Sequence, residues 1–527
     1  MSLHRCRRAV AVLSISAALL AALPAAAENR LTLGISAAPG TVDPHFNQGI
    51  STQALIYNIF DTLIESGPVY DLRPSLALSW TAVSDTVWEL KLRPNVHFTN
   101  GLPFTADDVA FTFARVPNVP NAVVSYASQI RAIERVEVVD PLTIRLHTKG
   151  PAPTLPNDIS SVSIVSRKVG EGATTEDYNA LRAAIGTGPF IIRSYTPGAA
   201  AELERNDNWW GERPNWDHVS IRYIPNAGAR SAALLSGGVD LINQPSPNDL
   251  PRFRDSPDLE VFSAPGTRLI YMAPNQSSEV APFITDNDGK PLPANPLRDL
   301  RVRQALSLAI DRAGLANRVM QGTAAGAFQF IPPGMYSYNP AIAVPAADPA
   351  RAKQLLAEAG YPDGFRVTLP VASDSRPTDP IAAQAVAQMW GRIGVQTSVE
   401  TMPLAAYGQR ARRMEFPFTY TGWGATGQAL HPLVNVIATY DRSRLTGSYN
   451  RSGYSNAGID ALIARASATM DDAAREQMLQ QAVAMAMDDL AIIPLYQLTN
   501  FWVARRGITY QASAYDYTRV VLARKAR

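Results

Sequence analysis

Cysteine is almost absent from this chain of 527 residues. Its one cysteine, Cys6, stands in front of an apolar stretch, whereas a lipidated cysteine follows one. After residue 27 the sequence contains no thiol. That part of the chain can therefore form no disulfide, no cysteine metal site and no cysteine nucleophile.

Long hydrophobic runs are also absent, except for one near the amino terminus. Residues 9–23 are apolar, but they fall short of the roughly 20 residues that a membrane-spanning helix needs. Arg5, Arg7 and Arg8 precede this stretch, and small residues follow it up to Ala27. This order predicts a secretory signal peptide, cleaved after about Ala27, and a periplasmic mature protein.

Charge is balanced and histidine is scarce. Without the three arginines of the predicted signal peptide, 45 Lys and Arg stand against 46 Asp and Glu. This balance does not favour a nucleic-acid partner, because nucleic-acid-binding surfaces are basic. The later histidines form no H-x-x-x-H pattern, so we expect no cofactor and no metal site made by the protein alone. They are His45, His97, His147, His218 and His431.

Catalytic motifs are equally scarce. The chain has no G-x-S-x-G elbow and no Walker A loop. Residues 422–427 fit G-x-G-x-x-G, but a dinucleotide loop opens a helix, and both Trp423 inside the motif and Pro432 soon after it argue against one. We therefore expect a protein that is not an enzyme. An exported α/β enzyme such as a hydrolase remains the alternative.

The second half of the chain alternates helix and strand patterns. Apolar residues at i, i+3, i+4 and i+7 predict a helix over about 302–320. Asp348 and Pro349 predict the start of another helix, and Gly360 its left-handed end. The chain then reads as a strand at 365–369, a helix at 379–393, a strand at 395–400, a helix from near Asp471 and a strand at 492–496. This alternation predicts an α/β domain over about 270–488.

The first half is richer in strands and turns. A helix is expected at 53–64, and strands at 88–92, 143–147, 190–193, 219–223 and 268–272. The late strand at 492–496 needs a partner, and the strand-rich first half is the expected host. About 500 residues after the signal peptide exceed what one hydrophobic core usually holds, so two or three domains are expected.

Short sequence stretches along nearly the whole mature chain resemble one family in order and spacing. The chain is similar to the solute-binding proteins of ABC importers, in the peptide, opine and nickel class known as family 5. The stretches include Val42-Asp43-Pro44, Phe60-Asp61-Thr62-Leu63-Ile64, Gly186-Thr187-Gly188-Pro189-Phe190, Asn208-Trp209-Trp210, Gly238-Val239-Asp240, Leu355-Leu356-Ala357-Glu358-Ala359-Gly360-Tyr361 and Ile492-Ile493-Pro494-Leu495-Tyr496.

The resemblance implies a fold of the α/β class, the two-lobed periplasmic-binding-protein fold of type II-like topology with an extra subdomain. One lobe would comprise residues 28–65, 180–266 and 490–527, with the subdomain at 66–179, and the other lobe residues 267–489. Hinge crossings would lie near 267–275 and 490–496. The lobes would close over a small solute, and the protein, as a monomer, would deliver it to ABC permease subunits in the inner membrane.

The resemblance also indicates pocket residues. The segment after the early Asp-Pro and the Gly-Trp turn of the second lobe contact ligands in peptide-binding relatives. Each of these residues has ordinary surface or core packing as its alternative. The candidates are Asn47, Gln48, Gly49, Ile50, Tyr126, Arg410, Tyr420, Trp423, Gly424, Thr426, Tyr496 and Gln497.

One position departs from the peptide-binding pattern. Peptide-binding relatives place an Asp three residues after the Trp, where it pairs with the ligand's α-ammonium group, whereas this chain has Thr426. We therefore expect that free peptides are not the main ligand. Arg410, Arg412 and Arg413 leave an anionic solute open, such as an opine, a sugar acid or a chelated metal. His431 is a candidate for a chelated metal, because nickel-chelate binders use a histidine in this region.

Overall fold

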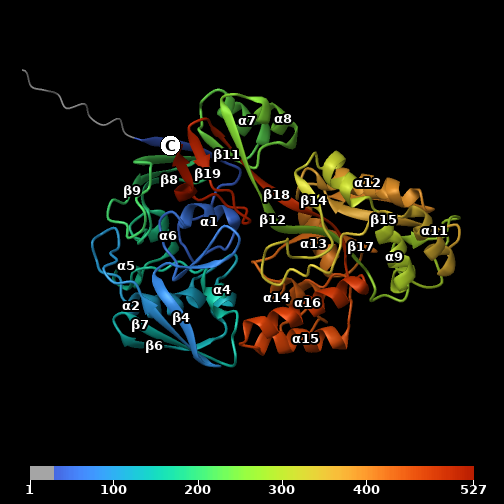
Figure 1. Cartoon of the computed structure of the whole chain (residues 1–527), viewed down its shortest axis with the longest axis horizontal. Helices are drawn as coiled ribbons and strands as arrows, with labels where there is room; N and C mark the ends of the chain where they lie inside the picture. The colour runs from blue at the N-terminus through green and yellow to red at the C-terminus, as the bar shows by residue number, and fades with distance from the viewer. Residues whose placement is uncertain (1–28, 527) are drawn as a thin grey trace, which may run out of the picture.

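The computed structural model describes residues 29–526, so the predicted signal peptide and Cys6 lie outside the described residues. Figure 1 shows two bodies side by side, with β12 and β18 running between them. The first body contains the early part of the chain and its carboxyl-terminal segment, and the second contains the yellow and orange elements. Within residues 29–526, no helix combines the length and apolar character needed to cross a membrane.

One nine-stranded sheet runs through both bodies. Its strands are, in order, β8 (Phe190–Thr196), β9 (Ala200–Arg205), β10 (His218–Tyr223), β1 (Arg30–Ile35), β11 (Leu241–Asn243), β18 (Ile493–Arg505), β12 (Leu259–Pro274) and β17 (Phe418–Gly424), with β14 (Ala324–Gly326) paired to β18. β1 is parallel to β10 and β11, and the other pairs are antiparallel. The predicted closing strand, 492–496, is the start of β18. It pairs with residues 270–272 of β12, one of the strands expected in the first half. Only the far end of β18, at residues 502–504, pairs with β11.

The pairing of β12 with β18 is interrupted twice, between Pro265 and Leu269 and between Ile270 and Tyr271. Pro265 faces Thr499 and Leu269 faces Gln497, so more residues separate the pairs on β12 than on β18. Extra residues in one strand form a bulge that bends the strand locally. Residues 266–268 of β12 therefore make an irregular segment in the strand that joins the bodies.

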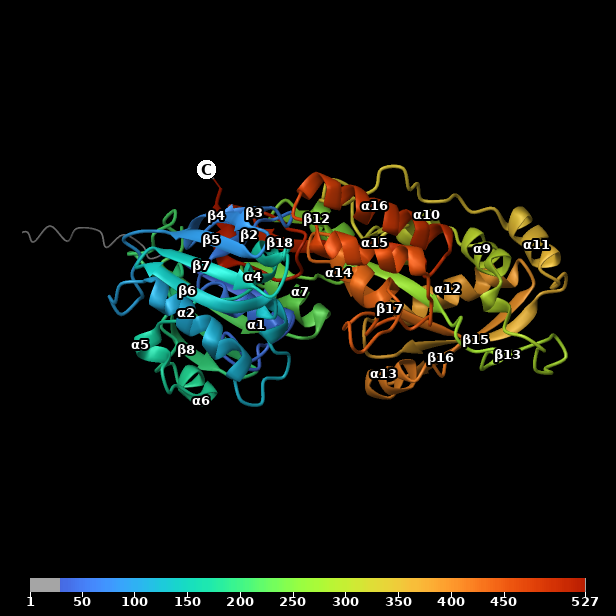
Figure 2. The same ribbon diagram turned by 90° about the horizontal axis from the view of Figure 1, so that it is seen from below.

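A second sheet lies in the first body (Figure 2). Its order is β4 (Ala77–Ser84), β5 (Val87–Leu92), β7 (Thr143–Thr148) and β6 (Ile133–Asp140). Helix α2 (Ala106–Arg115) begins with a capping box of Thr105 and Asp108 and buries Val109 and Phe113. Other elements here are β2 (Ile64–Ser66), β3 (Leu72–Pro74), α3 (Ala127–Ile130), α4 (Leu155–Ile159), α5 (Arg167–Gly170), α6 (Thr175–Asn179), α7 (Ala227–Leu235), α8 (Leu250–Asp255), β19 (Ile508–Tyr510), β20 (Ala523–Lys525) and 3₁₀ turns at Val116–Asn118, Pro247–Asp249 and Val520–Leu522.

The helix expected at 53–64 is shorter and begins earlier. Helix α1 covers Ile50–Ile56. The side chain of Asn58 donates to the carbonyl oxygen of Ala54 over 2.7 Å, which satisfies an acceptor at the helix end. By residue 64 the chain has entered strand β2. The apolar run that suggested a longer helix is instead divided between a helix, a turn and a strand.

The second body contains a smaller sheet, of β13 (Ile284–Thr285), β15 (Phe365–Ala372) and β16 (Val395–Met402). The expected alternation is confirmed: Asp348 caps α11 (Pro349–Glu358), Gly360 has φ +92°, and α12 (Asp379–Gly391) follows β15. Remaining elements are α9 (Leu300–Leu308), α10 (Arg312–Gly314), α13 (Leu404–Arg412), α14 (Leu430–Pro432), α15 (Ala457–Ala468), α16 (Asp472–Asp488), a 3₁₀ turn at Pro296–Arg298 and π-helical turns at Leu315–Val319 and Leu433–Ile437.

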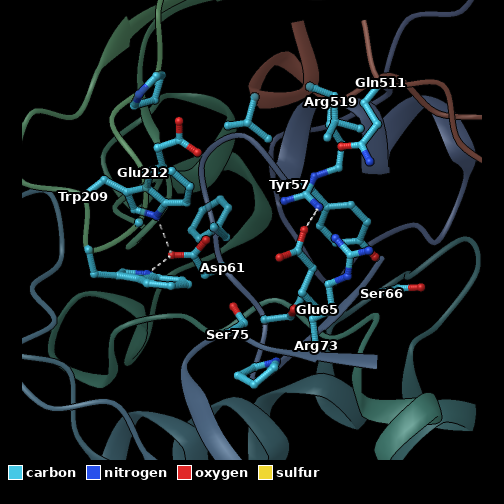
Figure 3. Close-up of a pocket in the computed structure, with 18 of the residues that line it drawn as sticks. Tyr57, Asp61, Glu65, Ser66, Arg73, Ser75, Trp209, Glu212, Gln511 and Arg519 are labelled. Carbon is cyan, nitrogen blue, oxygen red and sulfur yellow. Dashed lines mark hydrogen bonds and ion pairs between the residues drawn. The ribbon is translucent and has the colours of Figure 1, made fainter. Parts of the chain in front are cut away.

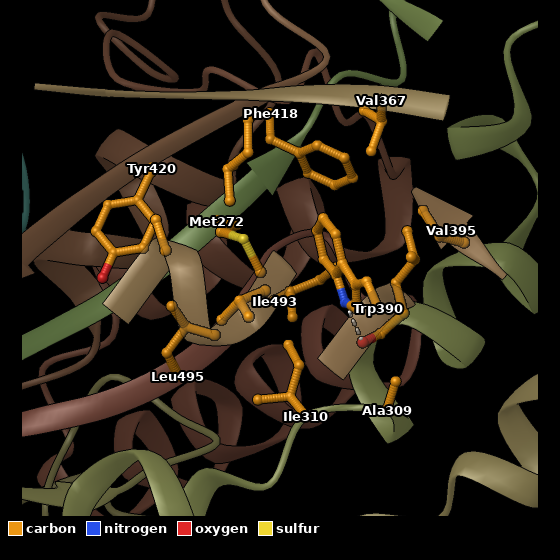
Figure 4. Close-up of a cluster of buried hydrophobic side chains, with 14 of the residues drawn as sticks. Met272, Ala309, Ile310, Val367, Trp390, Val395, Phe418, Tyr420, Ile493 and Leu495 are labelled. Carbon is orange, nitrogen blue, oxygen red and sulfur yellow. Dashed lines mark hydrogen bonds between the residues drawn. The ribbon is translucent and has the colours of Figure 1, made fainter. Parts of the chain in front are cut away.

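Trp390 of α12 occupies the centre of this core (Figure 4). Its ring is fully buried and packs against Phe418 of β17, with ring centroids 5.0 Å apart. Its indole N–H donates to the carbonyl oxygen of Leu306 over 2.9 Å. A buried indole with a satisfied N–H is a stabilising arrangement that ties α12 to α9.

The prediction of one continuous helix over 302–320 is wrong. Helix α9 ends at Leu308, and Asp311 starts α10 by accepting from the backbone N–H of Gly314. The break places the Arg312 guanidinium in the core, where Nε donates to the carbonyl oxygen of Pro494 over 2.8 Å. This contact attaches the helical segment to β18, a partner that the local apolar pattern does not reveal.

Candidate functional site

The Trp423 turn, residues 422–427, ends strand β17 at the edge of the long sheet. Leu269 of β12 is the partner of Trp423 in the ladder. The half-buried Trp423 ring packs against His431 and Tyr449, with centroids 5.2 and 5.0 Å away. Its indole Nε1 is buried and has no hydrogen-bond partner within residues 29–526. An unsatisfied buried donor costs about 1–3 kcal/mol, so an acceptor that reached it would be favoured.

Two arginines flank the backbone of the Trp423 turn. A Cβ placed on Gly422 would lie 3.5 Å from Nη1 of Arg376, and one on Gly424 would lie 3.3 Å from Nη2 of Arg268. The side chains of Arg376 and Arg268 are 24% and 27% exposed. Glycines at 422 and 424 therefore let both guanidinium groups approach the turn.

Each of these arginines is oriented by a carboxylate. Arg376 reaches Asp379 through Nε and Nη2, at 3.0 and 2.9 Å. Arg268 reaches Asp516 through Nε and Nη2, at 3.3 and 3.0 Å. Among the described residues, Nη1 of neither arginine makes a hydrogen bond. Since a guanidinium presents five N–H donors, both arginines keep donors for a further acceptor.

Arg451 adds a third positive charge beside the aromatic rings. Its guanidinium lies 5.3 Å from the centroid of Tyr449, which is 52% exposed, and Nη1 donates to the carbonyl oxygen of Ser448 over 2.9 Å. Arg451 forms no ion pair with a described carboxylate. Thr426 is exposed and contributes no charge. Around the turn, the cations thus exceed the carboxylates.

The predicted segment Asn47–Ile50 lies against the loop that precedes α3. Gln48 donates through Nε2 to the carbonyl oxygen of Ser125 over 2.7 Å, and its Oε1 accepts from Gln129 over 3.3 Å. Asn47 accepts through Oδ1 from the backbone N–H of Gly49 over 2.9 Å. The Gln48 amide and the Asn47 side-chain oxygen are therefore used within the protein, while Ile50 is 38% exposed.

Three predicted tyrosines lie in the core. Tyr126, Tyr420 and Tyr496 are 1%, 2% and 0% exposed. The hydroxyl groups of Tyr420 and Tyr496 are hydrogen-bonded to each other at 2.9 Å. Burial raises the pKa of all three hydroxyl groups. The aromatic side chains at the Trp423 turn are Trp423 and Tyr449.

The remaining predicted residues are held by neighbours. Gln497 is buried and donates to the carbonyl oxygen of Phe330 over 3.0 Å. Arg410 is bound to Glu415 at 3.2 Å and lies over the Phe416 ring at 4.7 Å. Arg413 is bound to the same carboxylate. The arginines that the sequence suggested for an anion are thus paired with Glu415 or, for Arg412, simply exposed.

His431 lies beside Trp423, as the sequence order suggested. His431 is exposed as a residue, but desolvation of its ring, with a further contribution from the positive charge of Arg131, lowers its pKa to about 4. The ring is therefore neutral near pH 7. Within the described part of the chain, no three His, Cys, Asp or Glu side chains cluster to hold a metal ion.

A separate cavity of about 290 Å³ lies in the first body (Figure 3). The indole N–H groups of Trp210 and Trp209 donate to Oδ2 of Asp61 over 2.7 and 3.2 Å, and Glu65 is bound to Arg519. The other arginines of the wall are also paired: Arg73 with Asp71, Arg213 with Asp207 and Arg524 with Glu212. Because these charges are paired within the protein, and no predicted pocket residue lines the cavity, we assign no ligand to it.

Sequence reasoning missed the residues that supply charge at the turn. Arg268 and Arg376 come from distant segments, and Asp516 from the carboxyl-terminal segment. The pairing of β12 with β17 places Arg268 beside Gly424, and no local sequence pattern shows that pairing. The paired glycines around Trp423 were the available signal, because they leave room for side chains from elsewhere.

A family model described as bacterial extracellular solute-binding proteins, family 5 Middle, matches residues 71–442. Heme-binding protein A of Haemophilus influenzae is 30% identical over 489 residues, which cover 86% of this chain and 84% of that protein. Di/tripeptide-binding protein 1 of Pseudomonas aeruginosa is 26% identical and covers 95% of each chain. Among solved structures, HbpA2 from Haemophilus parasuis superposes with a TM-score of 0.81, at 25% identity, over 95% of this chain and all of that one.

Proposed function

The chain belongs to family 5 of the bacterial extracellular solute-binding proteins, and from that premise we propose that its solute is an amphipathic anion with no free α-ammonium group. As a member of this family it is a solute-binding receptor of an ABC importer with the two-lobed fold of periplasmic binding proteins. The identity of the ligand class is the further step, and it is argued from the Trp423 turn.

The observation that carries the proposal is the pair of oriented arginines at that turn. Arg376 and Arg268 are each fixed along one edge by a carboxylate, and Nη1 of each remains without a hydrogen bond in the described chain. A fixed guanidinium binds a carboxylate with little loss of side-chain freedom. The adjacent rings of Trp423 and Tyr449 supply an apolar surface for the rest of the solute.

Thr426 supports the absence of an ammonium group on the solute. A charge buried by closure of two lobes needs a partner of opposite sign. The two carboxylates at the turn, Asp379 and Asp516, are already bound to arginine, and Thr426 offers only a hydroxyl. A peptide ammonium would therefore enter a region where cations are in excess. Sugar acids and other organic anions avoid this repulsion, and so do opine-like compounds without a protonated nitrogen.

The proposed location, partners and lobe boundaries are those expected for a member of this family. The protein would act in the periplasm after cleavage near Ala27, without enzymatic activity, as a monomer that delivers its solute to ABC permease subunits. Residues 28–65, 180–266 and 490–527 would form one lobe with 66–179 as its subdomain, and 267–489 the other. The bulge in β12 at 266–268 is a suitable place for the strand to bend on closure.

Native mass spectrometry tests the proposal directly. Residues 28–527 are purified from periplasm without denaturation, and the intact mass is compared with the denatured mass. We expect to find a bound organic anion, and we expect this anion to be chemically unchanged after it is released from the protein. A calorimetric panel of dipeptides, opine-type acids, sugar acids, a nickel–histidine chelate and hemin then ranks the classes. Tight binding of simple dipeptides would contradict the proposed class, and a chemically altered solute would favour an enzyme.

A further inference from the structure

The β2–β3 hairpin belongs to the first body, and Figure 2 shows β2 and β3 at the side of that body nearest β12 and β18. Tyr70, at the tip of this hairpin, has the left-handed φ of +62° that non-glycine residues rarely adopt. The tip is fixed by hydrogen bonds from Tyr70 N–H to the Gly67 carbonyl oxygen at 2.8 Å and from Ala514 N–H to the Pro68 carbonyl oxygen at 2.7 Å. The position of Tyr70 is therefore defined by the first body.

Tyr70 touches the end of the Trp423 turn. Gly427 has φ +81°, and a Cβ placed on it would lie 2.4 Å from Cβ of Tyr70 and 3.1 Å from its Cγ. Such separations are shorter than any ordinary carbon contact. Position 427 thus requires glycine for two independent reasons, its backbone conformation and the space taken by Tyr70.

The same side chain also meets the irregular segment of β12. Its hydroxyl lies within hydrogen-bonding reach of Thr267, and its ring packs edge-on against Tyr515 with centroids 6.1 Å apart. Thr267 in turn accepts through its carbonyl oxygen from the backbone N–H of Ala425 over 3.3 Å. The hairpin tip, the bulge in β12 and the Trp423 turn therefore meet at one tyrosine.

We propose that Tyr70 is a positioning residue for the Trp423 turn, a rigid stop in the first body against which residues 425–427 of the second body rest. Through this contact Tyr70 would fix both the orientation of Trp423 and the spacing of the two bodies. Its importance for solute binding rests on the proposed function, but the stop itself is a property of the protein without solute. Both readouts below are therefore made without solute.

A pair of glycine substitutions separates the stop from simple backbone strain. Gly427→Ala adds both strain and the collision with Tyr70. Gly322→Ala is the matched control, because Gly322 has φ +74° with no atom within 4 Å of its Cβ position. Spin labels on Ala199→Cys and Ala357→Cys, both exposed and in different bodies, report the spacing, and labelling is specific because no other cysteine follows residue 27.

We expect Gly427→Ala to displace the main peak of the electron-spin distance distribution and Gly322→Ala to leave it in place. Tyr70→Gly suits the left-handed φ and removes the colliding Cβ, so combined with Gly427→Ala it should abolish that displacement and give the distribution of Tyr70→Gly alone, which is broader than that of wild type because the stop is missing. The proposal is overturned if both alanine variants give the wild-type distribution, or if the double variant retains the displaced one.

The orientation of Trp423 has its own signature. In protein labelled with ¹⁵N-tryptophan, the Trp423 indole resonance is assigned by its loss in Trp423→Phe. Gly427→Ala should shift this resonance while those of Trp209 and Trp210 in the first body stay in place. An unshifted Trp423 resonance would overturn the positioning role. Failure of the proposed ligand class would change neither readout, so the two proposals fail separately.

Discussion

The indole N–H of Trp210 donates to Oδ2 of Asp61 over 2.7 Å. Trp209 and the hydroxyl of Thr187 donate to the same oxygen, at 3.2 and 3.1 Å. Burial of the carboxyl group outweighs these three donors and raises the pKa of Asp61 to about 6. This aspartate joins three segments of the first body.

Asp61→Asn is predicted to remove a pH-dependent part of the stability. Because the folded pKa is raised, the folded protein holds this proton more tightly than the unfolded chain, so the contribution of Asp61 is fully present below its unfolded pKa and is lost as the pH rises through about 6. Relative to wild type, the variant should gain up to about 3 kcal/mol in free energy of unfolding between acidic and neutral pH. Urea unfolding at several pH values measures this difference.

The control for this experiment is Asp158→Asn. Burial raises the pKa of Asp158 to about 7. Its substitution should therefore change the dependence of the free energy of unfolding on pH over a range that extends to higher pH. If the free energies of unfolding of wild type and Asp61→Asn changed with pH in parallel, the assignment of a raised pKa to Asp61 would be contradicted.

Local sequence patterns predict the second body well and the first body less well. The Asp348 cap, the Gly360 end and the strand–helix–strand order at 365–400 depend on neighbours in sequence, and the structure has all three. The long helix over 302–320 is wrong because Arg312 turns into the core to reach Pro494, a contact between residues far apart in the chain. The spacing of apolar residues predicts which side of a helix is buried. It does not predict which distant carbonyl group a buried arginine will bind.

The candidate site, like the fold, was predicted from the sequence only in part. Trp423 and His431 are only eight residues apart in the sequence, and their ring centroids lie 5.2 Å apart. Tyr420 and Tyr496 match the aromatic composition of a pocket, yet they are bonded to each other in the core. Whether an aromatic side chain lies in a core or on a surface depends on tertiary packing. Residue type alone does not decide it.

Trp423→Phe is predicted to weaken solute binding without destabilising the protein. The change removes the indole N–H that lacks a partner and keeps an aromatic ring against His431 and Tyr449. A lost hydrogen bond corresponds to about 1 kcal/mol, or several-fold in Kd, whereas Trp423→Ala should lose considerably more. Calorimetry with the solute identified by native mass spectrometry gives the Kd values.

Trp88→Phe is the matched control for that change. Trp88 donates to the carbonyl oxygen of Ala152 over 3.2 Å in the first body, so its substitution should lower stability and leave the Kd unaltered. Equal Kd values for wild type, Trp423→Phe and Trp423→Ala would remove the Trp423 turn from the binding site.

Thr426→Asp is predicted to create affinity for dipeptides. The new carboxylate would supply the counter-charge that a peptide ammonium needs, and Thr426 is exposed, so the fold should accept it. We expect at least a tenfold gain in dipeptide binding, in line with about 1.5–3 kcal/mol for a charged hydrogen bond. Thr426→Asn, which has the same shape and no charge, should show no such gain. If both variants gain equally, charge is not the reason that the wild type disfavours peptides.

Arg376→Gln is predicted to weaken binding of the anionic solute at least tenfold, since it removes a charge that Asp379 holds beside the turn. Loss of the arginine would leave Asp379, which is 2% exposed, without its partner, and that alone would destabilise the protein. The double variant Arg376→Gln/Asp379→Asn avoids this problem because it removes both charges. Weakened binding in the double variant, with a thermal midpoint close to wild type, therefore assigns the loss to the missing guanidinium.

Arg410→Gln completes the comparison, because Arg410 is the arginine that the sequence favoured and the structure pairs with Glu415. We expect its Kd to stay within about twofold of wild type, as is usual for a partly exposed ion pair. Raising the salt concentration should weaken wild-type binding and Arg410→Gln equally, and the Arg376→Gln/Asp379→Asn variant less. If Arg410→Gln instead weakened binding more than Arg376→Gln/Asp379→Asn does, the anion site would lie at helix α13 and not at the Trp423 turn. The expectation drawn from the sequence would then hold.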